Sequence, residues 1–369
     1  MKLNHIYKSI ACGVLLAMTA TSCDLDYNPV DTYSDVTEGV NKTDEKPIFN
    51  SVQDVETSMV TLHKKFRDQQ EHWYVDKLLI GDAHSDNAYA GTTGAEVVPY
   101  ETNSIEGSNS VLKRDWDRFL GDIAVANRII VGCDQLKALS ESERGKYQSQ
   151  AKIFRAMVMF DMVRLWGNFP VITTVGGDIT EDNVEEMYPT YFPPQNTAEE
   201  AYAQIEKDLT EAVENPNTPT NDTSDKSILT KSVARAMLAK VYAEKPLRDY
   251  AKVIKYADEL AADGFDLVED FSDLWAYDTE KKDCRVRNTK EAILEAHFPP
   301  GSGNWCTWMF GRNLSNWDES FTWAKWITPS RDLIRLYEEQ GDTKRYNESV
   351  VWYDCGWSNY YPADRKSVV

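Results

Sequence analysis

The stretch ESERGKYQSQAKIFRAMVMFDMVRLWGNFP, residues 141–170, is the most apolar helical segment of the chain. Its apolar side chains occur nearly all round the helix, which is typical of a helix that is buried on every side. Gly167 and Pro170 follow the last turn and carry the signals that end a helix. We therefore predict a central, mostly buried helix over 145–166, packed against 110–131 and the helices after 197. The apolar residues are Ile153, Phe154, Met157, Val158, Phe160, Met162 and Leu165.

Other segments place apolar residues at helical spacing around this one. Thr197 and Glu200 form a capping-box pattern at the start of one of them. Small Ala residues among larger ones suit closely packed antiparallel helix pairs of the tetratricopeptide type, although the literal repeat motif is absent. The sequence thus predicts a mainly α fold. The predicted helical segments are 51–70, 111–130, 197–213, 229–244, 249–264 and 329–341.

Between and after these helices the composition changes. Residues 68–108 mix Asp, Asn, Gly and aromatic residues, and NPNTPTNDTSDKS at 215–227 is a low-complexity loop. Helical periodicity fades from about residue 265 onward. AILEAHF at 292–298 has the pattern of a short strand, and 299–330 has the composition of a loop rich in Trp.

The N-terminus has the pattern of an export signal. An apolar run from Ile10 to Ala20 follows two lysines and is too short to span a bilayer. Small residues then precede Cys23, as at the cleavage and lipidation site of bacterial lipoproteins. We predict that Cys23 carries the lipid and that the polar stretch after it is a tether.

Composition excludes several partners and sites. The net charge of −20 makes a nucleic-acid partner improbable, because phosphates would repel such a surface. Cys133, Cys284, Cys306 and Cys355 are widely spaced, so one or two disulfides can form but the paired spacing of a zinc site is absent.

Nearly the whole chain after the signal resembles the SusD/RagB family of surface glycan-binding lipoproteins. The resemblance rests on the joint order of several stretches rather than on one catalytic signature. They are LLIGDAHSDNAY (78–89), WDRFLGDIAVANRII (116–130), AKIFRAMVMFDMVRLWGNFPVIT (151–173), LTKSVARAMLAKVYAE (229–244) and TPSRDLIRLYEEQGDTKRY (328–346).

The resemblance implies a tetratricopeptide-like helical-repeat scaffold with a loop-rich lobe. It also implies a lid on a SusC-like TonB-dependent transporter of the outer membrane, to which oligosaccharides are passed. We expect a signal peptide (1–22), a lipidated tether (23–48) and a SusD-like domain (49–369). Family members continue beyond GDTKRY with a late helical segment, so we expect the scaffold to be truncated at its C-terminus. Within the SusD-like domain, the scaffold would span 49–264 and the lobe 265–369.

A sugar ring offers apolar C–H faces and a rim of hydroxyls, so its site needs aromatic platforms beside polar side chains. GSGNWCTWMFGRNLSNWDESFTWAKW at 301–326 interleaves both kinds of residue, although many of these rings would also fill the core of a loop lobe. Trp305 and Trp308 are the leading candidates because they lie in a Gly-flanked loop. The polar candidates are Asn304 and Arg312, and Trp317 is a further ring.

A second candidate is EHWYVDKLLIGDAHSDNAYAG at 71–91, where the resemblance implies binding-loop residues. Trp73, Asp86, Asn87 and Tyr89 are its candidates. The alternation of Asp82, His84 and Asp86 would place three ligand types on one strand face. An oxygen-rich metal cage needs more ligands, so we expect a polar loop and no metal.

Catalysis and cofactors have no signal in this sequence. H-E-x-x-H, G-x-S-x-G and a phosphate-cradling Gly loop are all absent. We therefore expect a glycan-capture protein that is not an enzyme, with peptide capture by the same lid as the alternative and glycan hydrolysis as a third class. In the central helix, Arg155, Asp161 and Arg164 stand out, and Asp161 and Arg164 are spaced to form a structural ion pair.

Overall fold

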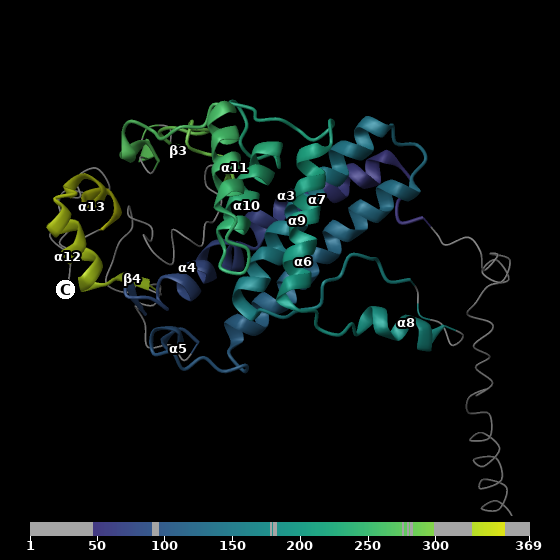
Figure 1. The fold of residues 1–369 in the computed structure, drawn as a ribbon, viewed down its shortest axis with the longest axis horizontal. Coiled ribbons are helices and arrows are strands. Elements are labelled where there is room, and N and C mark those ends of the chain that lie inside the picture. The colour runs from purple at the N-terminus through teal and green to yellow at the C-terminus, as the bar shows by residue number, and fades with distance from the viewer. Residues whose placement is uncertain are drawn as a thin grey trace, which may run out of the picture. The chain divides into compact units, whose positions relative to one another are not determined.

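The structure is a computed structural model, and it describes residues 47–90, 96–177, 179, 183–274, 277–278, 280, 283–298 and 327–350. The chain divides into two units, Met1–Pro47 and Ile48–Val369. Nearly all described residues belong to the second unit. Figure 1 shows this unit as mostly helical, so the predicted mainly α class is confirmed.

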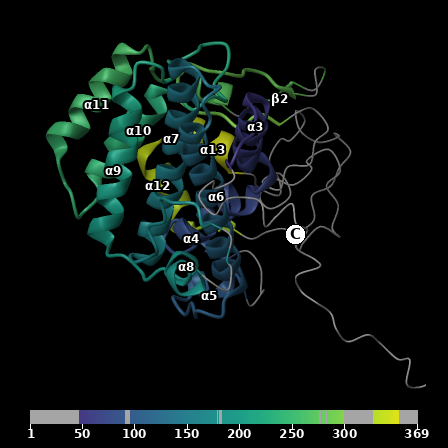
Figure 2. The ribbon, with the colours of Figure 1, turned by 90° about the vertical axis from the view of Figure 1, so that its right-hand side faces the viewer.

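Six helices form the scaffold. Each long helix packs mainly against its neighbours in the chain: α6 and α9 lie along α7, α10 lies on α9, and α11 lies on α10. α3 lies against α6 and α7. Figure 2 shows the same packing from the side. This neighbour-to-neighbour packing is that of a helical-repeat scaffold, as predicted. The helices are α3 (Val52–Asp68), α6 (Ser110–Gln135), α7 (Glu141–Trp166), α9 (Ala198–Glu214), α10 (Lys231–Ala243) and α11 (Tyr250–Ala262).

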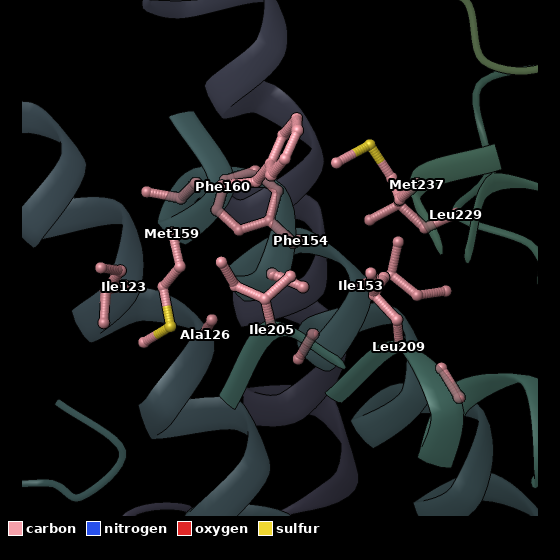
Figure 3. Packing of buried hydrophobic residues seen from close by; sticks show 14 of the residues in the cluster. Ile123, Ala126, Ile153, Phe154, Met159, Phe160, Ile205, Leu209, Leu229 and Met237 are labelled. Atoms are coloured by element: carbon pink, nitrogen blue, oxygen red, sulfur yellow. The ribbon is translucent and has the colours of Figure 1, made fainter. Parts of the chain in front are cut away.

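The central helix α7 ends at Trp166, as predicted, and begins at Glu141, four residues before the predicted start at 145. Ser140 caps it in a capping box with Glu143, and Gly167 ends it at φ 71°, a conformation that favours Gly. Its middle is buried on all sides, and Ile153, Phe154 and Met159 have no exposed surface. Figure 3 shows these side chains among residues of α6, α9 and α10. Met157, which we had placed in the core, is only partly buried at its edge.

A buried ion pair lies inside this apolar core. The Arg155 guanidinium donates to both carboxylate oxygens of Asp208 on α9, at 2.8 and 2.7 Å. It also donates to Oδ1 of Asn127 on α6 at 2.7 Å. The Asn127 amide donates in turn to the carbonyl of Ile172 at 2.9 Å. The network joins three helices and the segment after α7, and its charges have fixed partners.

Several helix ends agree with the sequence prediction, whereas α6 extends to Gln135, beyond the predicted end at residue 130. The Thr197 and Glu200 capping box starts α9, and Gly264 follows α11 at φ 92°. Gly341 adopts the left-handed conformation after α12 (Arg331–Gln340). The short helices α8 (Val184–Tyr191) and α13 (Thr343–Ser349) are among those that the sequence did not predict. α8 contains Pro189 and has no buried residue, so its sequence carries no core-facing stripe.

The segment after α3 is more regular than its composition suggests. A π-helix, η2 (Glu71–Val75), continues into α4 (Asp76–Gly81). A turn then leads to the strand β1 (Ala88–Ala90), and α5 (Val98–Glu101) follows. Leu79, Val97 and Tyr100 form a small second core with Ala83 and Val111. Our interpretation of this region as a loop was therefore wrong, since these buried residues hold short helices in place.

Between α11 and α12 the described residues contain little regular structure. The strand predicted at 292–298 is absent, and this segment has a bend at residues 293 and 294 and no helix or strand. The short elements that are present are η3 (Phe271–Leu274), β2 (Tyr277–Asp278), β3 (Asp283–Cys284) and β4 (Ile327–Pro329). β2 pairs with β3, and β4 pairs with β1, both antiparallel.

Two further predictions concern cysteines and the membrane. Cys133 is a free, fully buried thiol, so it does not take part in a disulfide. Burial raises the pKa of this thiol to about 12.

Among the described helices, none combines the length and the apolar character that a bilayer crossing requires.

Candidate functional site

The strand of the first candidate segment pairs, in a small antiparallel sheet, with a strand that follows the second candidate segment in the chain. β1 and β4 pair with Ala88 opposite Pro329, Tyr89 opposite Thr328, and Ala90 opposite Ile327. β1 belongs to the segment that contains Asp86, Asn87 and Tyr89. β4 begins directly after residue 326, where the Trp-rich stretch ends. The pairing therefore places β4, the strand that follows the Trp-rich stretch in the sequence, beside β1.

Ser330, at the start of α12, links the turn before β1 to the residues after β4 through hydrogen bonds. Its hydroxyl donates to the carbonyl of Asp86 at 2.5 Å, and its amide donates to the carbonyl of Asn87 at 2.9 Å. The same hydroxyl accepts the amide of Leu333 at 3.0 Å and so caps α12. One side chain thus fixes both the turn before β1 and the helix after β4.

The predicted polar side chains of the turn are exposed. Asp86 and Asn87 use their backbone carbonyls for Ser330, and their side chains make no hydrogen bond to the described part of the chain. Tyr89 is 39% exposed, and its hydroxyl accepts the amide of Arg331 at 3.4 Å. A carboxylate, an amide and a phenol ring are therefore available within four residues of chain. These are groups that can hydrogen-bond to sugar hydroxyls and cover a sugar face.

Trp73, the fourth candidate of this segment, does not belong to the exposed surface. It is 4% exposed on η2, and its ring contacts Phe66 and Phe154 at centroid distances of 4.7 and 5.6 Å. The expectation that Trp73 faces a ligand is therefore wrong. Its large apolar surface fills the core between α3 and α7 instead.

The candidates of the Trp-rich stretch, Trp305, Trp308, Asn304, Arg312 and Trp317, lie outside the described residues. Their roles stay predictions.

The proposed alternation of Asp82, His84 and Asp86 does not occur on a strand. These residues lie in the turn between α4 and β1, and the strand begins only at Ala88. Burial raises the pKa of Asp82, the least exposed of the three acidic or basic groups. Within the described ranges, no three His, Cys, Asp or Glu side chains gather as metal ligands would.

A pocket of about 480 Å³ lies between α4, α5, α6 and α7, next to this turn. Its base consists of side chains that are at most 1% exposed, namely His72, Tyr100, Asp115 and Phe119. Its rim consists of exposed side chains, namely Lys77, His84 and Arg164. Its apolar walls are Ile80, Ile105, Leu112, Leu165 and Trp166. The volume is in the range of small-molecule sites.

Ion pairs hold the rim. Lys77 pairs with Asp161 at 2.6 Å, and Arg164 pairs with Glu244 at 3.0 Å. The predicted pairing of Asp161 with Arg164 is therefore wrong in its partners, although both residues do form structural ion pairs. Each side chain pairs with a charged residue of another element instead. Asp161 pairs with Lys77 on α4, and Arg164 pairs with Glu244, which follows α10.

Comparison with known protein families identifies the family of this chain. Residues 32–243 match a SusD-like family model described as "Starch-binding associating with outer membrane". The match covers more than half of the chain. The chain belongs to the SusD-like family.

Three SusD-like relatives illustrate the extent of the match. A SusD-like protein of Bacteroides ovatus is 25% identical over 309 residues, which are 80% of this chain and 50% of the relative. A SusD superfamily structure from Bacteroides vulgatus gives a TM-score of 0.64 at 15% identity, covering 86% of this chain and 66% of that one. The surface glycan-binding protein A of Bacteroides fluxus gives a TM-score of 0.52 at 20% identity, covering 64% and 49%. The chain thus spans about half the length of the curated relative that it matches.

The pocket of this SusD-like chain was not predicted from the sequence. Its lining comes from η2, α4, α5, α6 and α7. The sequence analysis assigned no site role to Trp166 or Lys77. The buried acidic residue Asp115 on α6 is a sign of a buried polar site. It indicates a pocket only once the packing of α4 and α5 against α6 is known.

Proposed function

We propose that this chain is a cell-surface lipoprotein that captures oligosaccharides or polysaccharides and delivers them to a SusC-like TonB-dependent transporter of the outer membrane. The bound sugar would lie on the loop edge formed by the turn before β1 and the Trp-rich stretch. Asp86 and Asn87 would bind hydroxyls there. Tyr89, Trp305 and Trp308 would stack on the apolar sugar faces, with Asn304, Arg312 and Trp317 beside them.

The observation that carries this proposal is the pairing of β1 with β4. β1 follows the exposed side chains of the turn, and β4 directly follows the most aromatic stretch in the sequence, which supports a site made from both segments. Sugar binding needs that combination of rings and amides. The description of the family as starch-binding and the printed name of the Bacteroides fluxus relative, a surface glycan-binding protein, favour the same class of ligand.

The proposed lipid anchor rests on the N-terminal sequence, and the proposed place at the outer membrane rests on the family. The family description associates its members with the outer membrane. Cys23 would carry more than one acyl chain, which makes membrane attachment stable. A net charge of −20 would keep the protein body away from an anionic membrane surface.

The first experiment separates glycan capture from peptide capture and from catalysis. The full chain is run by affinity electrophoresis in gels that contain starch, laminarin, or another polysaccharide, and release of reducing sugar is measured on the same substrates. We expect retardation in at least one gel without release of sugar. Release that scales with the amount of protein would show an enzyme. No retardation in any gel, combined with binding of a peptide mixture, would favour peptide capture.

The second experiment tests the anchor. Cys23→Ala should move the protein from the membrane fraction to the soluble fraction of cells that process bacterial lipoproteins. Cys12→Ala, which changes a cysteine within the signal, is the matched control and should leave the distribution unchanged. A Cys23→Ala variant that stays on membranes after a high-salt wash would contradict lipid anchoring.

A further inference from the structure

We infer that the pocket between α4, α5, α6 and α7 is a separate subsite that binds one neutral pyranose ring, either free or as the end of a glycan. This inference deepens the proposed function, because it names a place for a single ring apart from the loop edge. It stands on two buried acceptor atoms at the pocket base and on the apolar walls above them.

The first acceptor is Nδ1 of His72. This side chain is 1% exposed, and its Nε2 lies 3.1 Å from Oδ2 of Asp122. Lys65 pairs with the other oxygen of Asp122 at 3.1 Å. A carboxylate only accepts, so Nε2 carries the proton and Nδ1 keeps a free lone pair. Burial lowers the pKa of His72, which keeps the ring neutral.

No described residue satisfies this Nδ1 atom. A buried polar atom without a partner destabilises the fold, because it has lost its hydrogen bonds to water without replacing them. A hydrogen-bond donor that enters the pocket would remove that destabilisation. His72 therefore marks the base of the pocket as a place for a donor.

The second acceptor is the carboxyl group of Asp115, whose Oδ1 makes no hydrogen bond to a described residue, although Nε of Arg114 lies 3.8 Å from it. Asp115 is 1% exposed and lies beside the fully buried Asp76, which Arg114 binds. Burial, and then the neighbouring Asp76, raise the pKa of Asp115 to about 9. Asp115 is thus a neutral carboxyl group that shares its proton with Asp76, and a carboxyl oxygen that does not bind Asp76 can accept a hydrogen bond from a ligand.

The base of the pocket therefore presents two hydrogen-bond acceptors and carries no net negative charge. A cation would meet Lys77 and Arg164 at the rim and Arg114 behind Asp115, so repulsion disfavours it. An anion would lack a donor at the base. A hydroxyl group donates without carrying charge, so a ligand with several hydroxyls matches the base best.

The walls match the rest of a sugar ring. Trp166 is half-buried and meets Trp116 edge to face at 5.2 Å, which fixes its ring. Ile80, Leu112 and Leu165 add aliphatic surface on the other sides. Such surface can cover the C–H faces of a pyranose while its hydroxyls reach the base and the rim.

The test uses the full chain and three methyl pyranosides as probes: the α-glucoside, the α-mannoside and the β-galactoside. Saturation-transfer NMR detects binding, and titration calorimetry gives the affinity. We expect the wild type to bind at least one of them. Ile105→Trp should abolish that binding, because Ile105 is a partly buried loop residue of the wall and an indole there would fill the pocket.

His72→Gln tests the acceptor directly. The glutamine amide can still donate toward Asp122, while the Nδ1 acceptor is lost. We expect affinity to fall roughly tenfold, which is the size of one hydrogen bond. Ile254→Trp on the exposed face of α11 is the matched control for the added indole and should bind as the wild type does.

Circular dichroism and thermal melting confirm that each variant is folded. If the wild type binds none of the three glycosides, only water satisfies the two acceptors and the inference is wrong. It is equally wrong if folded Ile105→Trp and His72→Gln bind as the wild type does.

Polysaccharide gels run in parallel keep the two proposals distinguishable. Loss of glycoside binding with gel retardation retained in Ile105→Trp supports a subsite separate from the loop edge. Glycoside binding by a wild type that no gel retards would support the subsite and contradict the proposed function.

Discussion

The helical scaffold and the loop edge are held together in different ways. In the scaffold, α6, α7 and α9 share a continuous apolar core that encloses the pair of Arg155 and Asp208. At the loop edge, three residue pairs of β1 and β4 and the hydrogen bonds of Ser330 make the junction. One region buries its polar groups with fixed partners, and the other leaves Asp86 and Asn87 exposed to solvent.

This difference separates stability from recognition. Removing a partner inside the scaffold leaves a charge in the core, which costs several kcal/mol. Removing a side chain at the loop edge leaves groups that water can satisfy, so folding is barely changed. The pocket beside the turn has a base that is as buried as the scaffold, yet Nδ1 of His72 and Oδ1 of Asp115 make no hydrogen bond to the described residues. Variants in each region should therefore have effects of different size and kind.

The largest effect is expected from Asp208→Ala. It leaves the buried guanidinium of Arg155 without its bidentate partner, and the free energy of unfolding should fall by about 3–5 kcal/mol. Urea unfolding followed by circular dichroism measures this change. A fall of less than about 1 kcal/mol would show that the pair is not central to the scaffold.

The next effect depends on pH and concerns Asp115. Its pKa in the folded chain, about 9, lies above the ordinary value of 3.8. The folded state therefore keeps a proton that the unfolded chain releases between these values. The stability linked to neutral Asp115 is fully present below about pH 4 and is lost as pH rises through 9.

Asp115→Asn stays neutral at every pH. Its free energy of unfolding should rise relative to the wild type from pH 6 to 9, by at most about 1.4 kcal/mol per pH unit. Asp117→Asn, an exposed neighbour on α6, is the control and should show no such trend. Parallel curves for wild type and Asp115→Asn would contradict the buried, neutral carboxyl.

Ser330→Ala should loosen the loop edge without disturbing the scaffold. It removes the cap of α12 and the bond to Asp86, at a cost of about 1 kcal/mol. Hydrogen exchange should accelerate at 86–90 and at the start of α12, and remain unchanged in α7. Uniform acceleration in both regions would mean that the two regions unfold as one unit.

The smallest effect is expected from Arg164→Ala. This side chain is 52% exposed, and its pair with Glu244 lies at the surface. Exposed pairs contribute about 0–1 kcal/mol, so the melting curve should stay close to that of the wild type. A loss comparable to that of Asp208→Ala would contradict the distinction between buried and exposed pairs.

The sequence predicted the scaffold because its information is local. Thr197 and Glu200 act at the start of α9, and Gly167 acts at the end of α7, each within one turn of the chain, and the structure has these helix ends where these residues put them. The partner of Arg155 could not be predicted in the same way. It lies on another helix, and only the packing of α9 against α7 brings Asp208 there.

The site was predictable only in part, for the same reason. Asp86, Asn87 and Tyr89 were chosen by residue type and resemblance, and they are exposed as a binding edge requires. β4 was missed because its partner lies far away in the chain, with Ser330 and Asp86 separated by 244 residues. Trp73 was misplaced because an aromatic residue in a polar segment can equally well turn into the core.

The central claim is that sugar stacks on the aromatic residues of the loop edge. Titration calorimetry with an oligosaccharide of the polysaccharide that retards the wild type tests it most directly, on Tyr89→Ala, Trp305→Ala and Trp308→Ala. Tyr250→Ala, an exposed ring on α11, is the control. We predict a wild-type Kd between about 1 μM and 1 mM, and a loss of about 1–3 kcal/mol for at least one loop-edge ring. Binding that is unchanged in all three folded variants would contradict the account.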